Sequence, residues 1–200
     1  MKQIFLLLFC SLLTFGVSAQ SNSLTAGIGL LNPKLRVQFE HGLNSNTSTG
    51  ANLTYYMVNW KGPRLEGFYR IYFSNDNENG LFAQGKAGVG LFTNVFDDGD
   101  DLTFVYYDDN FNELSGDIYE SNNWMTFGAG VAVGYKFTSN GGFVFESTLG
   151  YQFWSGPPDN YTLEYLMYYD DYYSLGETIG YYLVGPGFPL DLQFKFGFNF

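Results

Sequence analysis

Nine charged residues recur on one face of the segments in which polar and apolar residues alternate, and they are the first candidates for chemistry in this chain. They are five bases and four acids: Arg36, Glu40, Glu66, Arg70, Lys86, Lys136, Glu146, Asp191 and Lys195. Alternate residues of a β-strand point to the same side of the sheet. A sheet that closes on itself would therefore bring these charges together in its interior.

Charges inside such a closed sheet must pair or be hydrated, because an unpaired buried ion costs several kcal/mol. Two functions fit this requirement. One is a small charged channel. The other is a plug of ion pairs and hydrogen bonds that fills the interior, and we favour it because eight strands leave an interior just wide enough for side chains.

A second polar cluster could bind a cation. Four carboxylates lie close together at Asp97, Asp98, Asp100 and Asp101, and carboxylate oxygens are the ligands that Ca²⁺ prefers. The spacing does not match an EF-hand loop, which takes ligands at alternate positions and a Glu at the twelfth. We therefore favour a solvated acidic surface over a metal site at these positions, and we expect no cofactor.

Catalytic motifs are missing from the sequence. It contains no Gly-x-Ser-x-Gly, His-Glu-x-x-His or phosphate-binding loop, which are the common signatures of hydrolases, zinc proteases and nucleotide-binding enzymes. Its one histidine, His41, falls on the outward face of an expected strand, at the end opposite the long loops. We predict that the protein is not an enzyme.

The segments that position these residues all have the period of a strand. The last one alternates strictly from Leu190 to Phe200, and we expect eight in all, at about 24–31, 35–43, 51–60, 65–74, 81–95, 125–138, 143–154 and 190–200. Alternation of about ten residues between turn signals is typical of a transmembrane β-barrel. The sequence thus predicts an all-β fold, an eight-stranded antiparallel barrel in the outer membrane of a Gram-negative bacterium. Residues 31–34 could be a hairpin or a kink within one strand.

The first 19 residues have the basic, apolar and small-residue regions of a secretory signal peptide, which is removed. Residues 20–200 would then form one domain with no cysteine. Without Lys2 the chain has eight basic and 20 acidic residues, a formal charge of −12. Such a charge argues against nucleic-acid binding, which requires a basic face.

Strand parity assigns the connections to the two sides of the membrane. With the N-terminus in the periplasm, both long loops, 96–124 and 155–189, fall on the extracellular side, as is usual for outer-membrane barrels. Phe200 then ends the last strand at the periplasmic side, where the barrel-assembly machinery would bind that strand. The expected partners are therefore outer-membrane lipid and this machinery.

The long loops are acidic and rich in tyrosine. They contain 14 acidic residues and no Lys or Arg, and tyrosine-rich surfaces are common in recognition sites. An extracellular protein or glycan is thus a candidate partner, with packing of loop against loop as the alternative. The segment 162–184 could extend the barrel wall as a hairpin. We also predict that Trp60, Trp124 and Trp154 cap the outer mouth rather than face lipid.

A soluble, lipocalin-like barrel would show the same alternation with its apolar face inside. The positions of the glycines distinguish the two arrangements, because seven of them fall on the polar face. A narrow lumen needs small residues beside large ones, so that glycines are expected on the face that points inside. The seven glycines are Gly88, Gly90, Gly128, Gly130, Gly134, Gly150 and Gly197. We therefore place the polar face inside and the apolar face in contact with lipid.

Several aromatic and glycine motifs carry a family resemblance. They are Asn32-Pro33 followed by Leu35 to Glu40, Phe68 to Phe73, Gly80 to Ala83, Gly134 to Phe137, Phe145-Glu146 and Gly150-Tyr151. With them the chain resembles a group of small outer-membrane β-barrel proteins of unknown function in Bacteroidota, with the general OmpA/OmpX-type architecture. The resemblance implies a location and a fold and brings no catalytic motif.

Overall fold

The computed structural model describes residues 21–29, 33–57, 60–74, 76–93, 103–107, 113–117, 123–156 and 179–200. Eight strands form one closed barrel, and β6 and β7 form a separate two-stranded sheet. The barrel strands are β1 (Asn22–Gly29), β2 (Lys34–Asn44), β3 (Thr47–Tyr56), β4 (Gly62–Tyr72), β5 (Gly80–Thr93), β8 (Asn123–Thr138), β9 (Phe143–Trp154) and β10 (Leu190–Asn199).

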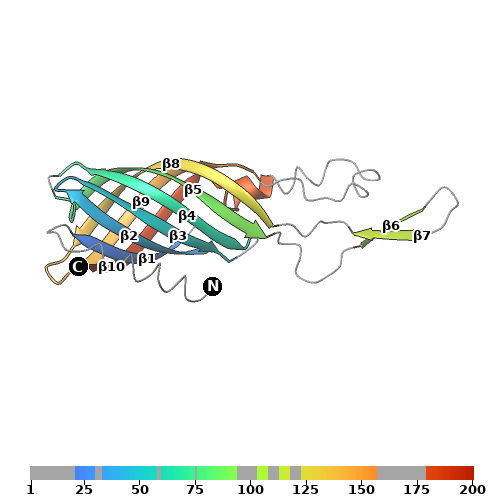
Figure 1. The fold of residues 1–200 in the computed structure, drawn as a ribbon, viewed down its shortest axis with the longest axis horizontal. Helices are drawn as coiled ribbons and strands as arrows, with labels where there is room; N and C mark the ends of the chain where they lie inside the picture. Colours follow the sequence, from blue (N-terminus) through green and yellow to red (C-terminus); the bar gives the residue numbers. More distant parts are fainter. Residues whose placement is uncertain are drawn as a thin grey trace.

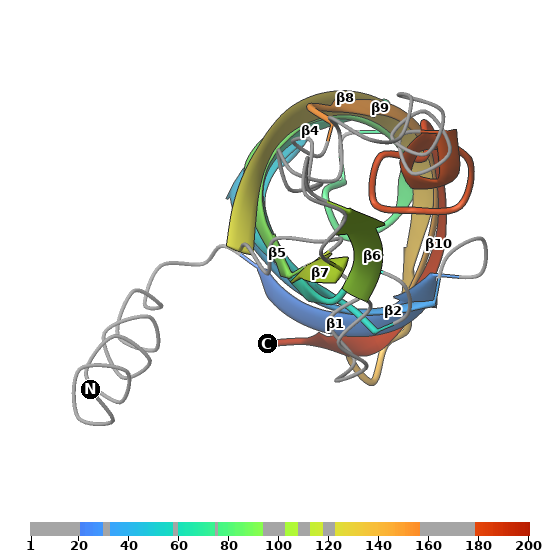
Figure 2. The ribbon, with the colours of Figure 1, turned by 90° about the vertical axis from the view of Figure 1, so that its right-hand side faces the viewer.

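Every neighbouring pair in the barrel is antiparallel, and the ring closes where β1 pairs with β10. Figure 1 shows the barrel from the side, and Figure 2 shows the closed ring from one end. The predicted eight-stranded antiparallel barrel is therefore confirmed. We call the end at which β1 begins and β10 ends the terminal end, and the opposite one the loop end.

The expected bounds of the third strand were wrong, for a reason found in the turn before it. The third strand begins at Thr47 rather than Ala51, because Asn44 pairs directly with Thr47 across a tight turn. It therefore also ends earlier, at Tyr56. Gly29 pairs with Lys34, so that β1 and β2 are two antiparallel strands of a hairpin rather than one kinked strand.

The apolar face of each strand points outward. On β8, for example, Val131 is 64% exposed while Thr126 and Lys136, on the opposite face, are buried. Aromatic residues stand at both ends of this outer face, with Phe127 near the loop end and Phe137 near the terminal end, and smaller aliphatic ones between them. The soluble, lipocalin-like alternative requires the inverse arrangement and is therefore wrong for the described strands.

Glycines on the inner face make room for large side chains. A Cβ atom added at Gly128 would lie 2.3 Å from the Trp154 ring, and one at Gly134 would lie 2.4 Å from the Phe82 ring. Both rings are buried inside the barrel. On the outer face, a Cβ at Gly85 would meet no atom within 4 Å.

This contrast gives a matched pair of substitutions. We expect Gly128→Ala to lower the free energy of unfolding by about 1–3 kcal/mol, because overpacking forces the backbone or ring to shift. Gly85→Ala is expected to leave stability unchanged or to raise it by about 0.4–1 kcal/mol, since alanine restricts the unfolded chain. Urea unfolding of both variants in detergent micelles tests this. Equal effects of the two substitutions would contradict the inward assignment of Gly128.

The connections at the loop end contain two further elements. One is the β6 (Thr103–Tyr107) and β7 (Glu113–Asp117) hairpin, drawn beyond the loop end in Figure 1. The other is a short helix at 179–183, where we had expected an arm of a hairpin. That expectation was wrong, since residues 179–185 form i to i+4 and i to i+5 backbone hydrogen bonds instead. No described helix is long and apolar enough to cross a membrane.

Candidate functional site in the barrel lumen

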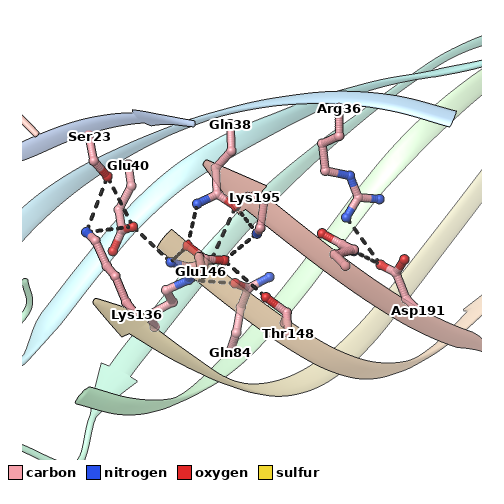
Figure 3. Close-up of polar contacts among 12 residues, drawn as sticks. Ser23, Arg36, Gln38, Glu40, Gln84, Lys136, Glu146, Thr148, Asp191 and Lys195 are labelled. Carbon is pink, nitrogen blue, oxygen red and sulfur yellow. Dashed lines mark hydrogen bonds and ion pairs between the residues drawn. The ribbon is translucent and has the colours of Figure 1, made fainter. Parts of the chain in front are cut away.

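All nine charged residues that the alternation placed on one face lie inside the barrel, and none is more than 7% exposed. They form two groups along the barrel axis, one toward each end. Figure 3 shows the Arg36–Asp191 pair at one side and the larger group around Glu146 at the other. We call these the loop-end cluster and the terminal-end cluster.

Glu146 is the centre of the terminal-end cluster. The Arg70 guanidinium donates to both of its carboxylate oxygens, at 2.6 Å and 2.8 Å. Lys195 forms an ion pair with Glu146, and Gln38 and Thr148 donate to it at 3.1 Å each. A fork-to-fork Arg–carboxylate pair is among the stronger polar interactions in proteins. Glu146 is thus held by donors from β2, β4, β9 and β10.

Glu40 is the second carboxylate of the terminal-end cluster. It accepts from Arg70 at 2.8 Å and from Lys136 at 3.2 Å. The Ser48 and Tyr72 hydroxyls each donate to it at 2.5 Å. The Arg70 guanidinium therefore bridges two carboxylates, and the cluster joins side chains from opposite walls of the barrel.

Asp191 and Glu66 are the carboxylates of the loop-end cluster. Asp191 accepts from Lys86 at 2.6 Å, Lys34 at 3.0 Å and Arg36 at 3.3 Å. Glu66 lies 3.0 Å from Lys86, 3.3 Å from Arg36 and 3.6 Å from Arg64. This cluster therefore contains four cations and two carboxylates.

Lys34 and Arg64 belong to the loop-end cluster but were missed from the sequence. Lys34 is 5% exposed and Arg64 is fully buried. Each lies two residues before a residue that was predicted, Arg36 or Glu66, and so has the same strand phase. They were missed because both lie outside the strand boundaries that we expected. Extending the alternation by one residue at each strand start would have found them.

Aromatic rings enclose the clusters at both ends. The Arg70 guanidinium carbon lies 4.2 Å from the centre of the Phe82 ring and 4.7 Å from that of Phe68. At the loop end, the Arg64 guanidinium carbon lies 4.3 Å from the centre of the Trp154 ring and 5.0 Å from that of Tyr56. Such cation–π contacts are strongest where water is excluded.

The three tryptophans have different positions at the loop end. Trp124 and Trp154 are buried inside the barrel. Trp60 is half-buried and lies after the end of β3, although we had expected it to be the last residue of that strand. Trp60 and Trp124 both pack against the Tyr181 ring, with centroids 5.8 Å and 5.6 Å away. We call Trp60, Trp124 and Tyr181 the aromatic cap. Trp154 lies against Arg64 and is not part of it.

Tyr181 closes the mouth from the short helix at 179–183. Its hydroxyl donates to the Ser155 carbonyl at 3.0 Å, and the neighbouring Tyr182 hydroxyl donates to the Trp154 carbonyl at 3.1 Å. Burial raises the pKa of Tyr181 to about 12, which further favours the neutral hydroxyl that donates this hydrogen bond. Sequence alternation could not identify this residue, because the helix does not follow the strand period.

The sequence offered two other candidates. Asp97, Asp98, Asp100 and Asp101 lie outside the described residues, and within those residues no group of three or more His, Cys, Asp or Glu could hold a metal ion. His41 is half-buried at the terminal end of β2, with Nδ1 2.7 Å from the Asn22 amide oxygen.

Comparison with known proteins shows similarity to a solved structure but to no family. No family model matches the chain, and no curated protein matches it. The chain is similar to the crystal structure of the N-terminal β-barrel domain of Pseudomonas aeruginosa OprF, with 12% identity and a TM-score of 0.44. That similarity covers 90% of this chain and 96% of the other. The description of the fold rests on the strand pairing of this chain itself.

Proposed function

We propose that this protein is an integral outer-membrane β-barrel with a closed lumen, and that it acts at the cell surface through its long loops. The observation that carries the proposal is the burial of the whole lumen charge network beneath an apolar outer face. An exposed apolar wall this large is unfavourable in water and is what a bilayer requires. The resemblance to small outer-membrane barrels of Bacteroidota supports the same location.

The way the charges are shared supports a closed lumen. Arg70 contacts carboxylates on two other strands, and Asp191 contacts bases on β2 and β5. A permeating ion would have to displace these pairs, and separating a buried pair without compensation costs about 3–5 kcal/mol. The aromatic cap covers the loop end of the same path. We therefore prefer the plug to the small channel.

Single-channel recording tests the closed lumen. The protein refolded in a planar bilayer is expected to give no stable conductance steps. Stable steps in the wild-type barrel that change in size in an Arg70→Ala variant would contradict the proposal, because the ions would then pass the terminal-end cluster.

The surface role rests on the composition of the loops. They carry 14 acidic residues and no base, and aromatic side chains are enriched in protein interfaces. We propose an extracellular protein or glycan as the partner. No residue pattern of the described barrel supports catalysis, so that binding or a structural role remains the function we propose.

A further inference from the structure

We propose that the loop-end cluster holds a small inorganic anion, of the size of chloride, beneath the aromatic cap. This inference goes beyond the proposed function, since a closed barrel with a surface role needs no ligand in its lumen. Two separate observations lead to it: the charge of the cluster and a set of buried donors that lack acceptors.

The charge of the loop-end cluster is unbalanced. Its four cations share two carboxylates, a formal charge of +2, and all six side chains are at most 7% exposed. The other described acids of the barrel do not help, because Glu40 and Glu146 belong to the terminal-end cluster and Asp76 and Glu78 lie in the turn at that end. Uncompensated charge in such a site is costly, and a bound anion would reduce it.

Unused donors gather at the same place. Arg64 Nε, Trp154 Nε1 and the Tyr56 hydroxyl are buried and have no hydrogen-bond partner among the described atoms. Their side chains are in contact, because the Arg64 guanidinium lies between the Tyr56 and Trp154 rings. The guanidinium and indole nitrogens can only donate, so that a cation could not satisfy them.

A fourth unused donor extends the group toward the mouth. Trp124 Nε1 is also buried without a partner, and its ring is connected to Tyr56 through Phe92, with centroid distances of 5.3 Å and 5.5 Å. Glu66 oxygens lack hydrogen bonds as well, but they lie within ion-pair distance of Lys86, Arg36 and Arg64. What Arg64 Nε and the two indole nitrogens lack is therefore an acceptor.

Enclosure sets the size of the anion. Tyr56, Phe92 and Trp154 are about 1% exposed, and Tyr181 is fully buried above them. Such surroundings limit a ligand to a small ion, since a nucleotide or sugar phosphate would need an open cleft. Losing one hydrogen bond to a charged ligand should weaken its binding by about tenfold or more.

Thermal unfolding in detergent micelles tests the site with chloride as the probe. The midpoint for the full chain is expected to rise with sodium chloride and to saturate, relative to sodium gluconate of equal ionic strength, since a ligand that binds only the folded state stabilises it. Trp154→Phe keeps a ring over Arg64 and removes only the donor, and it should weaken chloride about tenfold. Lys136→Met, in the terminal-end cluster, is the control and should keep the wild-type chloride dependence.

A crystal grown in sodium bromide gives a second readout, in which an anomalous peak is expected near Arg64 and Trp154. Equal midpoints in chloride and gluconate for the wild-type chain would overturn the proposal, as would an unchanged chloride dependence in Trp154→Phe. A peak only at the protein surface would do the same. None of these results would contradict the proposed closed lumen, because single-channel conductance tests that proposal separately.

Discussion

Replacing Glu146 by Gln is expected to lower the free energy of unfolding by about 3–5 kcal/mol, the usual effect of breaking a buried ion pair. The substitution keeps the shape of the side chain and removes its charge. Arg70, Lys136 and Lys195 would then share only Glu40 within the terminal-end cluster. Denaturant unfolding of the barrel in lipid vesicles, followed by tryptophan fluorescence, measures the change.

Two further variants show whether the charge is responsible. Glu78→Gln makes the same chemical change in the β4–β5 turn and should alter stability by no more than about 0.5 kcal/mol. Adding Lys195→Met to Glu146→Gln returns the cluster to its original formal charge, so that the double variant should be more stable than the sum of the two single effects predicts. A loss below 1 kcal/mol for Glu146→Gln would mean that the cluster does not hold the barrel together.

The sequence predicted most of the fold because one physical rule governs the barrel wall. Alternate residues face opposite sides of a strand, so that the charged face and the apolar face can be read directly, and both Val131 and Lys136 lie where this rule puts them. The number of strands followed from the turns between alternating segments. Strand ends were less predictable, because alternation says nothing about where pairing stops.

The partners within the lumen could not be predicted in the same way. Alternation indicates that Arg70 and Glu146 both point inward, but they are 76 positions apart in the chain. Whether they meet depends on the stagger between strands around the whole ring, which is set by the register of every pair. Composition alone also could not place four cations and two carboxylates at one end.

Irregular segments were the least predictable part of the site. Trp60 and Tyr181 both come from connections at the loop end, and they meet because the chain at 179–189 folds back over the mouth. Neither residue follows a repeating pattern. The hydroxyls of Tyr181 and Tyr182 also hold the short helix at the end of β9, through the Ser155 and Trp154 carbonyls.

We expect both long connections at the loop end to lie outside the cell. The short turns, the start of β1 and the end of β10 share the opposite end of the barrel, and outer-membrane barrels keep short turns on the periplasmic side. Residues 94–122 and 155–189 contain many aromatic residues but no Lys or Arg. Chymotrypsin should therefore cut within them, while trypsin should not, which provides a matched control within one protein.

Digestion of intact cells with chymotrypsin, followed by fractionation of the membranes, tests whether the barrel lies in the outer membrane with both long connections outside the cell. We expect that the protein is recovered in the outer-membrane fraction, that chymotrypsin cleaves it in intact cells within 94–122 or 155–189, and that trypsin leaves both segments uncut. Recovery in the soluble periplasm would contradict the membrane assignment. Cleavage of these segments only after the outer membrane is permeabilised would instead show that the barrel has the opposite orientation.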